Sequence, residues 1–441
     1  MKNSVVIERV LIDTLRLAPV SLLIHPKKQI EKAQKFLAAF DQVPVVYAEP
    51  NGDIIGGEEI WLALKANGDS EVNVIFVNDK TPAEIKAIRL ALHRLPLDAK
   101  WDAENLTAVM SELASINFDL DLTGFDAPQI DVYLSLDVPK ANVEENGADI
   151  PSPELTPVSQ RGSIWKLGRH RVGCGDATDL AFVSAILDNQ QAHVCFVDPP
   201  YNIPVDGFIS GKGRHHHHEF LQGSGELSSA DFFAFLRHSF SVLKSNCAPT
   251  ALIYACIDWR HVKEMTVAGH ACDMPLYQIV TWVKSNGGMG GIYRNQSEFI
   301  CVFKAGDATP LDNVELGRHG RNRTNVWNYP GMSSFGIERD SLLGMHPTVK
   351  PVAMIADALR DVTKRGEIVL DTFLGSGSTL IAAEETGRSC RGVELDPIYV
   401  DVAIRRWQNA TGRDAILSGT GQTFSSVAER RVPLIEDFTH G

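Results

Sequence analysis

The chain has 441 residues, a formal net charge of −13, 44% hydrophobic residues and 22% charged residues. This composition excludes a chain that is disordered throughout, and the length indicates two or three domains. No run of about 18 consecutive apolar residues occurs, and the first residues lack a secretory pattern, so we expect a cytoplasmic protein without a membrane span. Seven cysteines without a CxxC pair exclude a disulfide framework and a zinc ribbon, and they predict buried free thiols.

Short strands and helices alternate in the first third of the chain. The runs 43–49 and 73–78 are apolar, and 81–95 combines a Thr cap, an early proline and apolar residues three and four apart. The latter pattern predicts a helix. Residues 138–161 hold four prolines and several acids without an aromatic residue, which predicts an extended linker. We therefore expect a small α+β domain over 1–137.

Beyond the linker, strands are followed by helices. This alternation predicts a Rossmann-like α/β domain over 162–441 with a mainly parallel sheet. Its buried strands are predicted at 193–201, 250–257, 367–373 and 389–396.

A Gly-, Ser- and His-rich segment, 202–230, interrupts this pattern and predicts a long loop. Its four adjacent histidines, 215–218, cannot all face one ion, and no Cys or acid cluster lies nearby. We therefore expect no metal there, or elsewhere in the chain.

The first motif with chemical content is Asp198-Pro199-Pro200-Tyr201, at the end of a predicted strand. The prolines remove N–H donors, and an ionised carboxylate only accepts. The Asp198 carboxylate and the Pro199 carbonyl would accept both N–H bonds of an exocyclic amino group, while the Tyr201 ring stacks on the base. Accepting both hydrogens makes the amino nitrogen nucleophilic. A strand-ending turn with a capping Asp is the alternative for this motif alone.

The second motif is the glycine-containing turn DTFLGSGST at 371–379, between a predicted strand and a helix. Gly375 and Gly377 permit close backbone approach to a cofactor, and Glu394, at the end of the next strand, is placed to bind a ribose diol. The full G-x-G-x-x-G pattern is absent, so a tight structural turn is the alternative.

Two shorter motifs complete the set. HPTVKP at 346–351 precedes a predicted helix, and Gly175-Asp176 follows the start of the second domain. Taken alone, the first predicts only a proline-delimited helix start and the second only a turn with an N-cap.

In this order the four motifs resemble the β-class DNA amino-methyltransferases, which use S-adenosylmethionine (SAM). The resemblance covers about residues 161–415, with Thr372 where the family usually has proline. It implies a catalytic tetrad of Asp198, Pro199, Pro200 and Tyr201. It implies a SAM site formed by Asp176, Thr348, Lys350, Asp371, Phe373, Gly375, Gly377 and Glu394. Glu394 would contact the ribose and Asp176 would lie near the adenine. Thr348 and Lys350 would lie near the methionine end.

Residues from about 281 to 336 resemble the target-recognition region of that family, with a Trp-x-Lys, Tyr-Arg and Glu pattern and with Ser297 where a His is common. Arginines bind phosphates or guanine edges, and aromatic rings stack on unstacked bases. The DNA contacts expected here are Arg294, Arg318, Arg321, Arg323 and Trp327. A solvated loop with a packed tryptophan is the alternative for 317–331.

The charge distribution agrees with a partner on the C-terminal part. Residues 1–140 carry 14 Lys and Arg against 21 Asp and Glu, whereas residues 161–441 carry 28 against 30. We expect double-stranded DNA to contact a local patch in the second segment. The family resemblance also implies a homodimer.

The N-terminal part resembles ParB/sulfiredoxin-like domains over about 12–115, through an HPK segment at 25–27 and the run IIGGEE at 54–59. Such domains carry polar and basic residues after the glycine, where this chain has Glu58 and Glu59. Carboxylates repel phosphate. We therefore transfer neither CTP hydrolysis nor nuclease activity to this domain, and expect an accessory role in DNA docking or dimerisation.

Together these observations predict a DNA adenine N6-methyltransferase. Cytosine N4-methylation needs the same geometry around another amine, and Asp before Pro-Pro-Tyr favours adenine within the family. A non-enzymatic ParB-like DNA-binding protein with a decayed methyltransferase half is the alternative from another class. The intact Asp198, Gly375, Gly377 and Glu394 argue against decay.

Overall fold

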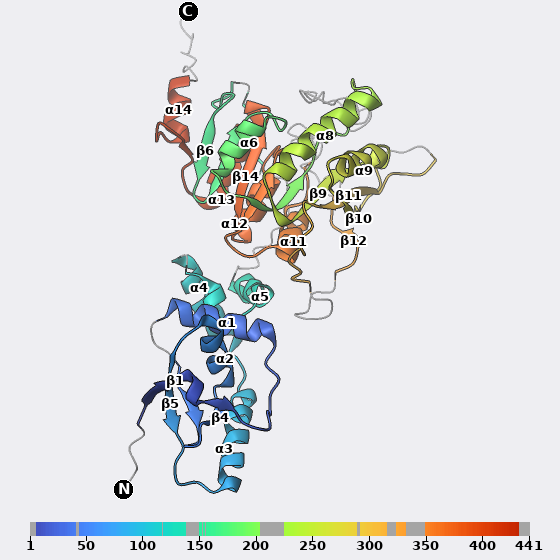
Figure 1. Cartoon of the computed structure of the whole chain (residues 1–441). Coiled ribbons are helices and arrows are strands. Elements are labelled where there is room, and N and C mark those ends of the chain that lie inside the picture. Colours follow the sequence, from blue (N-terminus) through green and yellow to red (C-terminus); the bar gives the residue numbers. More distant parts are fainter. Residues whose placement is uncertain are drawn as a thin grey trace, which may run out of the picture. The chain divides into compact units, whose positions relative to one another are not determined.

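The computed structural model describes residues 6–40, 44–116, 118–137, 150–151, 153–154, 156–202, 225–288, 292–314, 323–331 and 349–431. They belong to two compact units, Met1–Ala141 and Asn142–Gly441 (Figure 1). Among the described residues, no helix is both long and apolar enough to cross a membrane. All seven cysteines are free and six are buried, as predicted.

The N-terminal unit is built on a mixed five-stranded sheet with the order β1-β5-β3-β4-β2. β3 and β5 confirm the strands expected at 43–49 and 73–78. Val46 and Val74 are fully buried beneath α2, against Trp61. The strands are β1 (Glu8–Leu11), β2 (Arg16–Leu17), β3 (Val46–Ala48), β4 (Asp53–Gly56) and β5 (Glu71–Phe76). The α-helices are α1 (Lys27–Ala39), α2 (Glu58–Asn67), α3 (Pro82–Arg94), α4 (Ala103–Ser115) and α5 (Ala127–Asp137).

Helix α3 confirms the helix predicted at 81–95, with its start where the sequence places it. Thr81 Oγ1 accepts a hydrogen bond from the Glu84 backbone N–H at 3.3 Å, and the Glu84 carboxylate accepts one from the Thr81 N–H at 2.8 Å. These reciprocal bonds form a capping box and satisfy two donors that a helix start leaves without partners. Pro82 occupies the first helical position, where its missing N–H costs nothing.

Helices α4 and α5 form a second small core in this unit. Met110, Leu120 and Ile130 are buried together, separately from the core under the sheet. The side chain of Asp102 caps α4 by accepting a bond from the Asn105 N–H at 3.0 Å. This helical pair therefore has its own packing, although the sequence pattern led us to treat 1–137 as one domain.

The C-terminal unit contains a ten-stranded sheet with the order β12-β10-β11-β9-β8-β13-β14-β7-β6-β15. Its five central strands, from β9 to β7, run parallel. The strands are β6 (Ile164–Leu167), β7 (His170–Cys174), β8 (Ala192–Val197), β9 (Cys247–Ile257), β10 (Leu276–Val283), β11 (Ser297–Lys304), β12 (Val326–Asn328), β13 (Ile368–Asp371), β14 (Ser389–Glu394) and β15 (Ile416–Leu417). The helices are α6 (Leu180–Leu187), α8 (Ser229–Ser245), α9 (Val262–Ala271), α11 (Val352–Val362), α12 (Ser378–Glu385), α13 (Pro397–Thr411) and α14 (Phe424–Arg431). All four strands expected in this domain are present.

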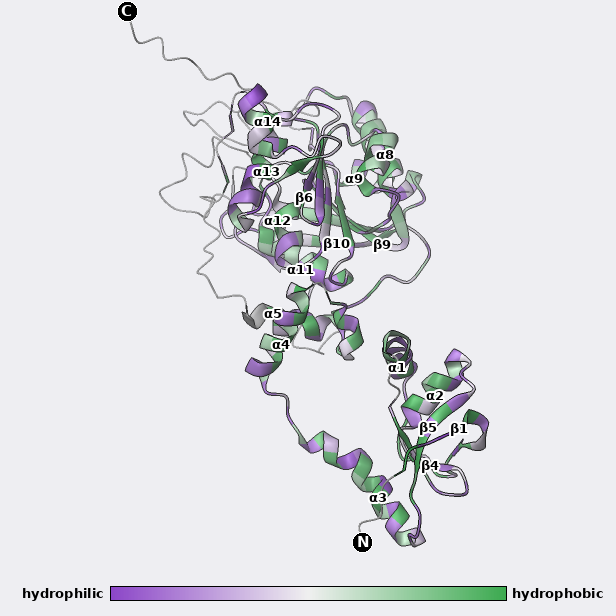
Figure 2. Cartoon of the chain, turned by 90° about the vertical axis from the view of Figure 1, so that its left-hand side faces the viewer, coloured by the Kyte–Doolittle hydropathy of each residue, from purple (hydrophilic) through white to green (hydrophobic). Residues whose placement is uncertain are grey.

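Helices cover both faces of this sheet, which gives three layers and two cores. Along β8, Val194 and Phe196 pack into the core under α11, α12 and α13, whereas Cys195 and Val197 pack into the core under α6, α8 and α9. From Val194 to Val197 this strand is apolar at every position, as expected for a parallel sheet between helices. Figure 2 shows this contrast, with hydrophobic strands and helices that carry both colours.

The C-terminal end of the expected linker is part of the folded C-terminal unit. Val158 is fully buried and Ser159 is 1% exposed. The Asp401 carboxylate on α13 accepts the backbone N–H groups of both residues, and Trp165 Nε1 donates to Ser159 Oγ at 3.0 Å. The expected linker over 138–161 therefore ends earlier than predicted. Its residues 138–149 lie outside the described part of the chain.

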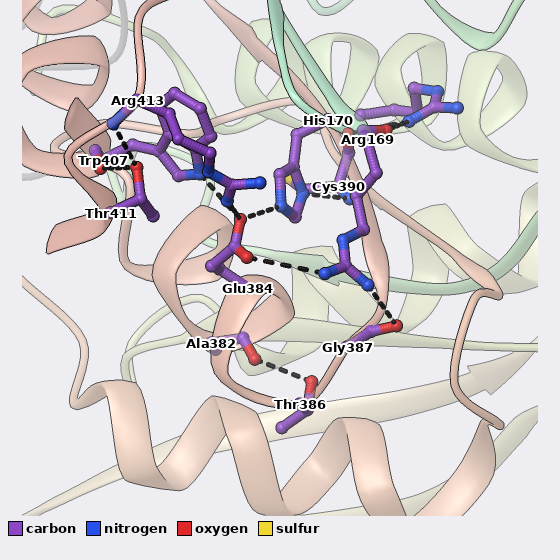
Figure 3. Close-up of polar contacts among 11 residues, drawn as sticks. Arg169, His170, Ala382, Glu384, Thr386, Gly387, Cys390, Trp407, Thr411 and Arg413 are labelled. Carbon is purple, nitrogen blue, oxygen red and sulfur yellow. Dashed lines mark hydrogen bonds and ion pairs between the residues drawn. The ribbon is translucent and has the colours of Figure 1, made fainter. Parts of the chain in front are cut away.

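Glu384, on α12, joins three elements of the C-terminal unit (Figure 3). Its Oε2 accepts hydrogen bonds from His170 Nε2 at 2.8 Å, from Trp407 Nε1 at 2.8 Å and from Arg413 at 2.6 Å. His170 and Trp407 are fully buried. The backbone N–H of Cys390 donates to His170 Nδ1 at 2.9 Å, so the proton of the neutral ring is on Nε2 and points at Glu384.

Candidate active site

The sequence motifs meet at one edge of the parallel sheet. Asp198 follows β8, Asp371 ends β13, Glu394 ends β14 and Asp176 follows β7. These four strands are consecutive neighbours in the sheet and all run in one direction. Their carboxyl ends therefore lie side by side, at the edge where open α/β sheets bind ligands.

The Asp198 carboxylate is held by two donors in the described structure. Lys350 Nζ lies 2.6 Å from Oδ2, and the Tyr201 hydroxyl donates to Oδ1 at 2.8 Å. The Asp198 side chain is 20% exposed, whereas the Lys350 side chain is 5% exposed. Lys350 Nζ also lies 5.2 Å from the centre of the Tyr201 ring. Lys350 was expected at the methionine end of SAM; the structure places its ammonium on the carboxylate of Asp198.

A second ion pair supports this arrangement. Glu298 Oε2 lies 3.1 Å from the Tyr201 hydroxyl and 3.4 Å from Lys350 Nζ, and Glu298 Oε1 pairs with Lys284. Lys284 directly follows β10, and Glu298 lies on β11 opposite Trp282. The role of these two residues does not follow from the sequence, because only the β10–β11 pairing brings them to Asp198.

Burial and charge act against each other in this cluster. Burial raises the pKa of the Asp198 carboxyl. The Lys350 ammonium lowers that pKa and the Glu298 carboxylate raises it, and together the three effects leave it above its ordinary value. Burial would also raise the pKa of Glu298, but Lys350 and Lys284 outweigh it and lower that pKa to about 2. Burial lowers the pKa of Lys350, but the charges of both carboxylates reverse this direction. The cluster therefore contains two carboxylates and two ammonium groups, and Asp198 is the carboxylate most easily protonated.

The glycine-containing turn after β13 lies directly over β14. The Gly375 N–H donates to Glu394 Oε2 at 2.8 Å, and the Asp396 N–H donates to Oε1 at 2.9 Å. Gly375 and Gly377 have φ angles of +52° and +86°, which side-chain-bearing residues rarely adopt. A Cβ on Gly392 would lie 2.6 Å from the Leu374 side chain, so the close approach of the turn to β14 needs glycine there.

This turn meets the chemical requirements of a SAM site. Each oxygen of Glu394 has a lone pair left after its backbone bond, so the carboxylate can still accept from a ribose diol. Burial raises the pKa of Asp371 to about 7, although bonds from Thr379 and the Phe373 N–H oppose it. A buried carboxyl of this kind is stabilised in its charged form by a nearby cation, and SAM carries two cationic groups.

Asp176 lies at the adjoining strand end. Its Oδ1 accepts from the Thr178 N–H at 2.8 Å and from the Thr178 hydroxyl at 2.7 Å. The Gly175 N–H donates to the Glu394 carbonyl at 2.9 Å, which brings Asp176 close to the Glu394 end of the site. Its second carboxylate oxygen has no hydrogen bond among those described.

Two of the expected DNA contacts, Arg323 and Trp327, are buried or paired with other side chains. Arg323 bonds Asp361 at 3.0 Å and the Tyr329 hydroxyl at 2.8 Å, and its guanidinium lies 4.7 Å from the centre of the Trp327 ring. Trp327 is 6% exposed and packs in the core. Both side chains have structural roles here, and we do not propose either as a DNA contact. Arg294 is exposed and remains a candidate, although its guanidinium donates to the backbone carbonyls of Gly287 and Gly288. Thr348, Arg318, Arg321 and the histidines 215–218 lie outside the described residues.

An aromatic–basic pair that sequence reasoning missed lies at the same edge of the sheet. Trp259 follows β9, the strand parallel to β8, and is 57% exposed. The Arg260 guanidinium lies 4.9 Å from the centre of its ring and bonds Asp258 at 2.8 Å. A tryptophan directly beyond a predicted buried strand was the available signal.

The chain matches two protein families. Residues 192–405 match the DNA methylase family of N6 and N4 methyltransferases, and residues 104–161 match the ParB-methyltransferase HTH domain. The type II methyltransferase M.ScaI of Streptomyces caespitosus is 36% identical over 88 residues, 20% of this chain and 29% of the relative. M2.DpnII of Streptococcus pneumoniae is 23% identical over 223 residues, 48% of this chain and 80% of the relative. The crystal structure of the M1.HpyAVI–SAM complex, 18% identical, covers 54% of this chain and 98% of its own, with a TM-score of 0.38.

The alignment to M.ScaI spans less than a third of that relative. The methylase match contains Asp198, Asp371 and Glu394, and the helix-turn-helix match contains α4 and α5. SAM is the cofactor of the methylase family. The chain therefore contains a domain of the N6/N4 DNA methylase family, over residues 192–405, and a ParB-methyltransferase helix-turn-helix domain ahead of it.

Proposed function

We propose that this chain is a SAM-dependent DNA methyltransferase acting on the N6 amino group of adenine. The observation that carries the proposal is the Asp198 cluster, a strand-end carboxylate held by Tyr201 and Lys350. It lies at the sheet edge shared with the Gly375–Glu394 turn. A polarising acceptor and a cofactor turn on neighbouring strands fit the transfer of a methyl group to an amine.

The Asp198 carboxylate and the Pro199 carbonyl would accept the two N–H bonds of an extruded adenine amino group. The Tyr201 hydroxyl has one proton and two acceptors, Asp198 Oδ1 at 2.8 Å and Glu298 Oε2 at 3.1 Å. When the amino group donates to Asp198, the hydroxyl can bond Glu298 instead. The incoming base therefore replaces a bond without leaving a buried donor unpaired.

Lys350 would keep Asp198 in its acceptor form. A protonated carboxyl would present a donor to the amino group, whereas the ammonium at 2.6 Å favours the ionised state. SAM supplies a methyl group bound to a sulfonium, the electrophile of the reaction. No base has to act first, because the amino N–H becomes acidic only after the nitrogen carries the methyl group. Positioning and polarisation then account for most of the rate enhancement.

The exposed groups near the strand ends provide DNA contacts in this proposal. Trp259 and Arg260 lie beyond β9, and Tyr293 and Arg294 lie between β10 and β11, with Tyr293 85% exposed. Aromatic faces stack on unstacked bases, and arginines neutralise phosphates. The helix-turn-helix domain, with α4 and α5, is a further candidate for DNA contact.

A transfer assay with purified full-length chain, tritiated SAM and unmethylated plasmid tests the proposal. We expect label in DNA with the wild type and none with Asp198→Ala, while both proteins bind SAM equally in calorimetry. Wild-type turnover by Asp198→Ala would overturn the catalytic assignment. Cytosine N4-methylation is the second candidate, because the matched family includes it; the identity of the labelled nucleoside separates the two.

A further inference from the structure

The N-terminal unit contains a group of metal-ligating side chains that the methyltransferase proposal does not use. One nitrogen of His25 and one carboxylate oxygen each of Glu58 and Glu59 lie within 4.8 Å of one another. His25 lies two residues before α1, and the two glutamates are the first residues of α2. The group therefore joins the starts of two helices, and a ligand held there would link them.

Several polar atoms in and around this group are buried without a hydrogen bond. Glu58 is 2% exposed and its Oε2 has no partner, and the same holds for the buried His25 Nε2. Arg89 is 9% exposed, and its Nε also has no partner. The Arg89 guanidinium lies 3.6 Å and His93 Nε2 3.5 Å from Glu58 Oε1, too far for good hydrogen bonds. Buried polar atoms without partners are rare in native proteins and indicate a missing water, ion or ligand.

The hydrogen bond on the other side of His25 determines which kind of ligand fits. His25 Nδ1 lies 3.2 Å from the side-chain oxygen of Gln29. An amide oxygen only accepts, so Nδ1 carries the proton and Nε2 presents a lone pair. A lone pair and two carboxylates then face one small space. Groups that only accept repel one another unless a cation lies between them, and an imidazole oriented through its other nitrogen is typical of metal ligands.

We propose that His25, Glu58 and Glu59 bind a divalent first-row transition-metal ion, with Zn²⁺ as the expected occupant. One imidazole nitrogen and two carboxylate oxygens are ordinary zinc ligands. Arg89 and His93 lie near Oε1 of Glu58. The site differs in chemistry from a phosphate pocket, because two carboxylates at the start of α2 repel phosphate. The ion fastens the segment before α1 to α2 and takes no part in methyl transfer.

Titration of the metal-free full-length chain with Co²⁺, followed by visible absorption and by displacement with Zn²⁺, tests this site. We expect the wild type to bind one Co²⁺ more than His25→Ala or Glu59→Gln binds. The histidines 215–218 are present in every protein compared, so metal bound to them cancels in the difference. His238→Ala and Glu104→Gln, which change an exposed histidine and an exposed carboxylate elsewhere, are the matched controls and should keep the wild-type stoichiometry.

Thermal unfolding gives a second readout. Saturating Zn²⁺ should raise the melting temperature of the wild type and of both controls, but not that of His25→Ala or Glu59→Gln. Glu59 is only partly buried, so Glu59→Gln keeps the test valid if His25→Ala fails to fold. Equal Co²⁺ stoichiometry in the wild type and in Glu59→Gln would overturn the proposal, as would a wild type that binds no Co²⁺. Methyl transfer should be unchanged in either variant.

Discussion

Glu384 offers a quantitative test of the packing that holds the methyltransferase unit together (Figure 3). Its Oε2 accepts from His170, Trp407 and Arg413. Replacing it with alanine leaves the His170 and Trp407 N–H groups without an acceptor, and both residues are fully buried. Replacing it with glutamine keeps a neutral acceptor in the position of Oε2 and removes only the charge.

The two substitutions should therefore differ in size. Each buried donor left unpaired costs about 1–3 kcal/mol, so two of them predict a loss of about 2–6 kcal/mol for Glu384→Ala. The Arg413 side chain is 46% exposed, and such a pair adds about 0–1 kcal/mol at most. Glu384→Gln should cost about 1 kcal/mol, because charged hydrogen bonds become neutral ones. In a unit of this size about 2–4 °C of melting temperature corresponds to each kcal/mol.

Differential scanning of the full chain, with attention to the transition of the C-terminal unit, measures these losses. We expect a decrease on the order of 10 °C for Glu384→Ala and about 3 °C for Glu384→Gln. Burial alone would raise the pKa of Glu384, but bonds from His170 and Trp407 lower it to about 2. Because the pKa of Glu384 is lower in the folded state than in the unfolded state, its ionised carboxylate stabilises the fold at pH values above the ordinary Glu pKa. This stabilisation is lost as the pH falls toward 2. The gap between wild type and Glu384→Gln should therefore shrink below pH 4. Equal melting temperatures for the two variants would refute the idea that the unpaired N–H groups of His170 and Trp407 cause the loss.

The remaining predictions concern the active site. Asp198→Asn should lower methyl transfer by at least about a thousandfold, because the charged acceptor is lost, with the Kd for SAM unchanged within about twofold; a large change in Kd would place Asp198 in the cofactor site instead. Lys350→Met should move the acidic limb of the kcat profile to higher pH, since removing the ammonium raises the pKa of Asp198 further; an unmoved limb would contradict the pairing. The pKa of Asp371 is raised to about 7, so below pH 7 cationic SAM must displace the proton of the Asp371 carboxyl in order to bind. The Kd for SAM should therefore rise by up to about tenfold from pH 7 to pH 6. Asp371→Asn should abolish that slope in calorimetry, and a slope that persists would assign it to another group.

Local patterns in the sequence predicted the parts of the fold that depend on neighbouring residues. The Thr81–Glu84 capping box and the apolar run of β8 follow from local preferences, and both are present. The positions of Asp198 and Glu394 at strand ends also followed, because parallel strands place their carboxyl ends at one edge. The order of the strands, which makes β8 and β13 neighbours, was not predicted from the sequence.

Contacts between segments that are far apart in the chain could not be predicted from local sequence patterns. Lys350 reaches Asp198 across 152 positions, so nothing local distinguishes this contact from one with the cofactor. Arg323 looked like a DNA contact because its segment is basic, but the carboxylates that bind it lie on α11. Val158 looked solvent-exposed among prolines and acids, and only α13 explains its burial. In each case the partner, rather than the residue type, determines the role.

The proposed reaction and the proposed base can be tested together on plasmid DNA from a methylation-deficient host that expresses the full-length chain. Nucleoside mass spectrometry identifies the modified base, and single-molecule sequencing shows its sequence context, with the Asp198→Ala chain expressed in parallel as the control. We expect N6-methyladenine in a defined motif with the wild type and unmodified DNA with the variant. N4-methylcytosine would retain the mechanism and contradict the proposed base, and unmodified DNA with a wild type that also fails to bind SAM would contradict the proposed enzyme.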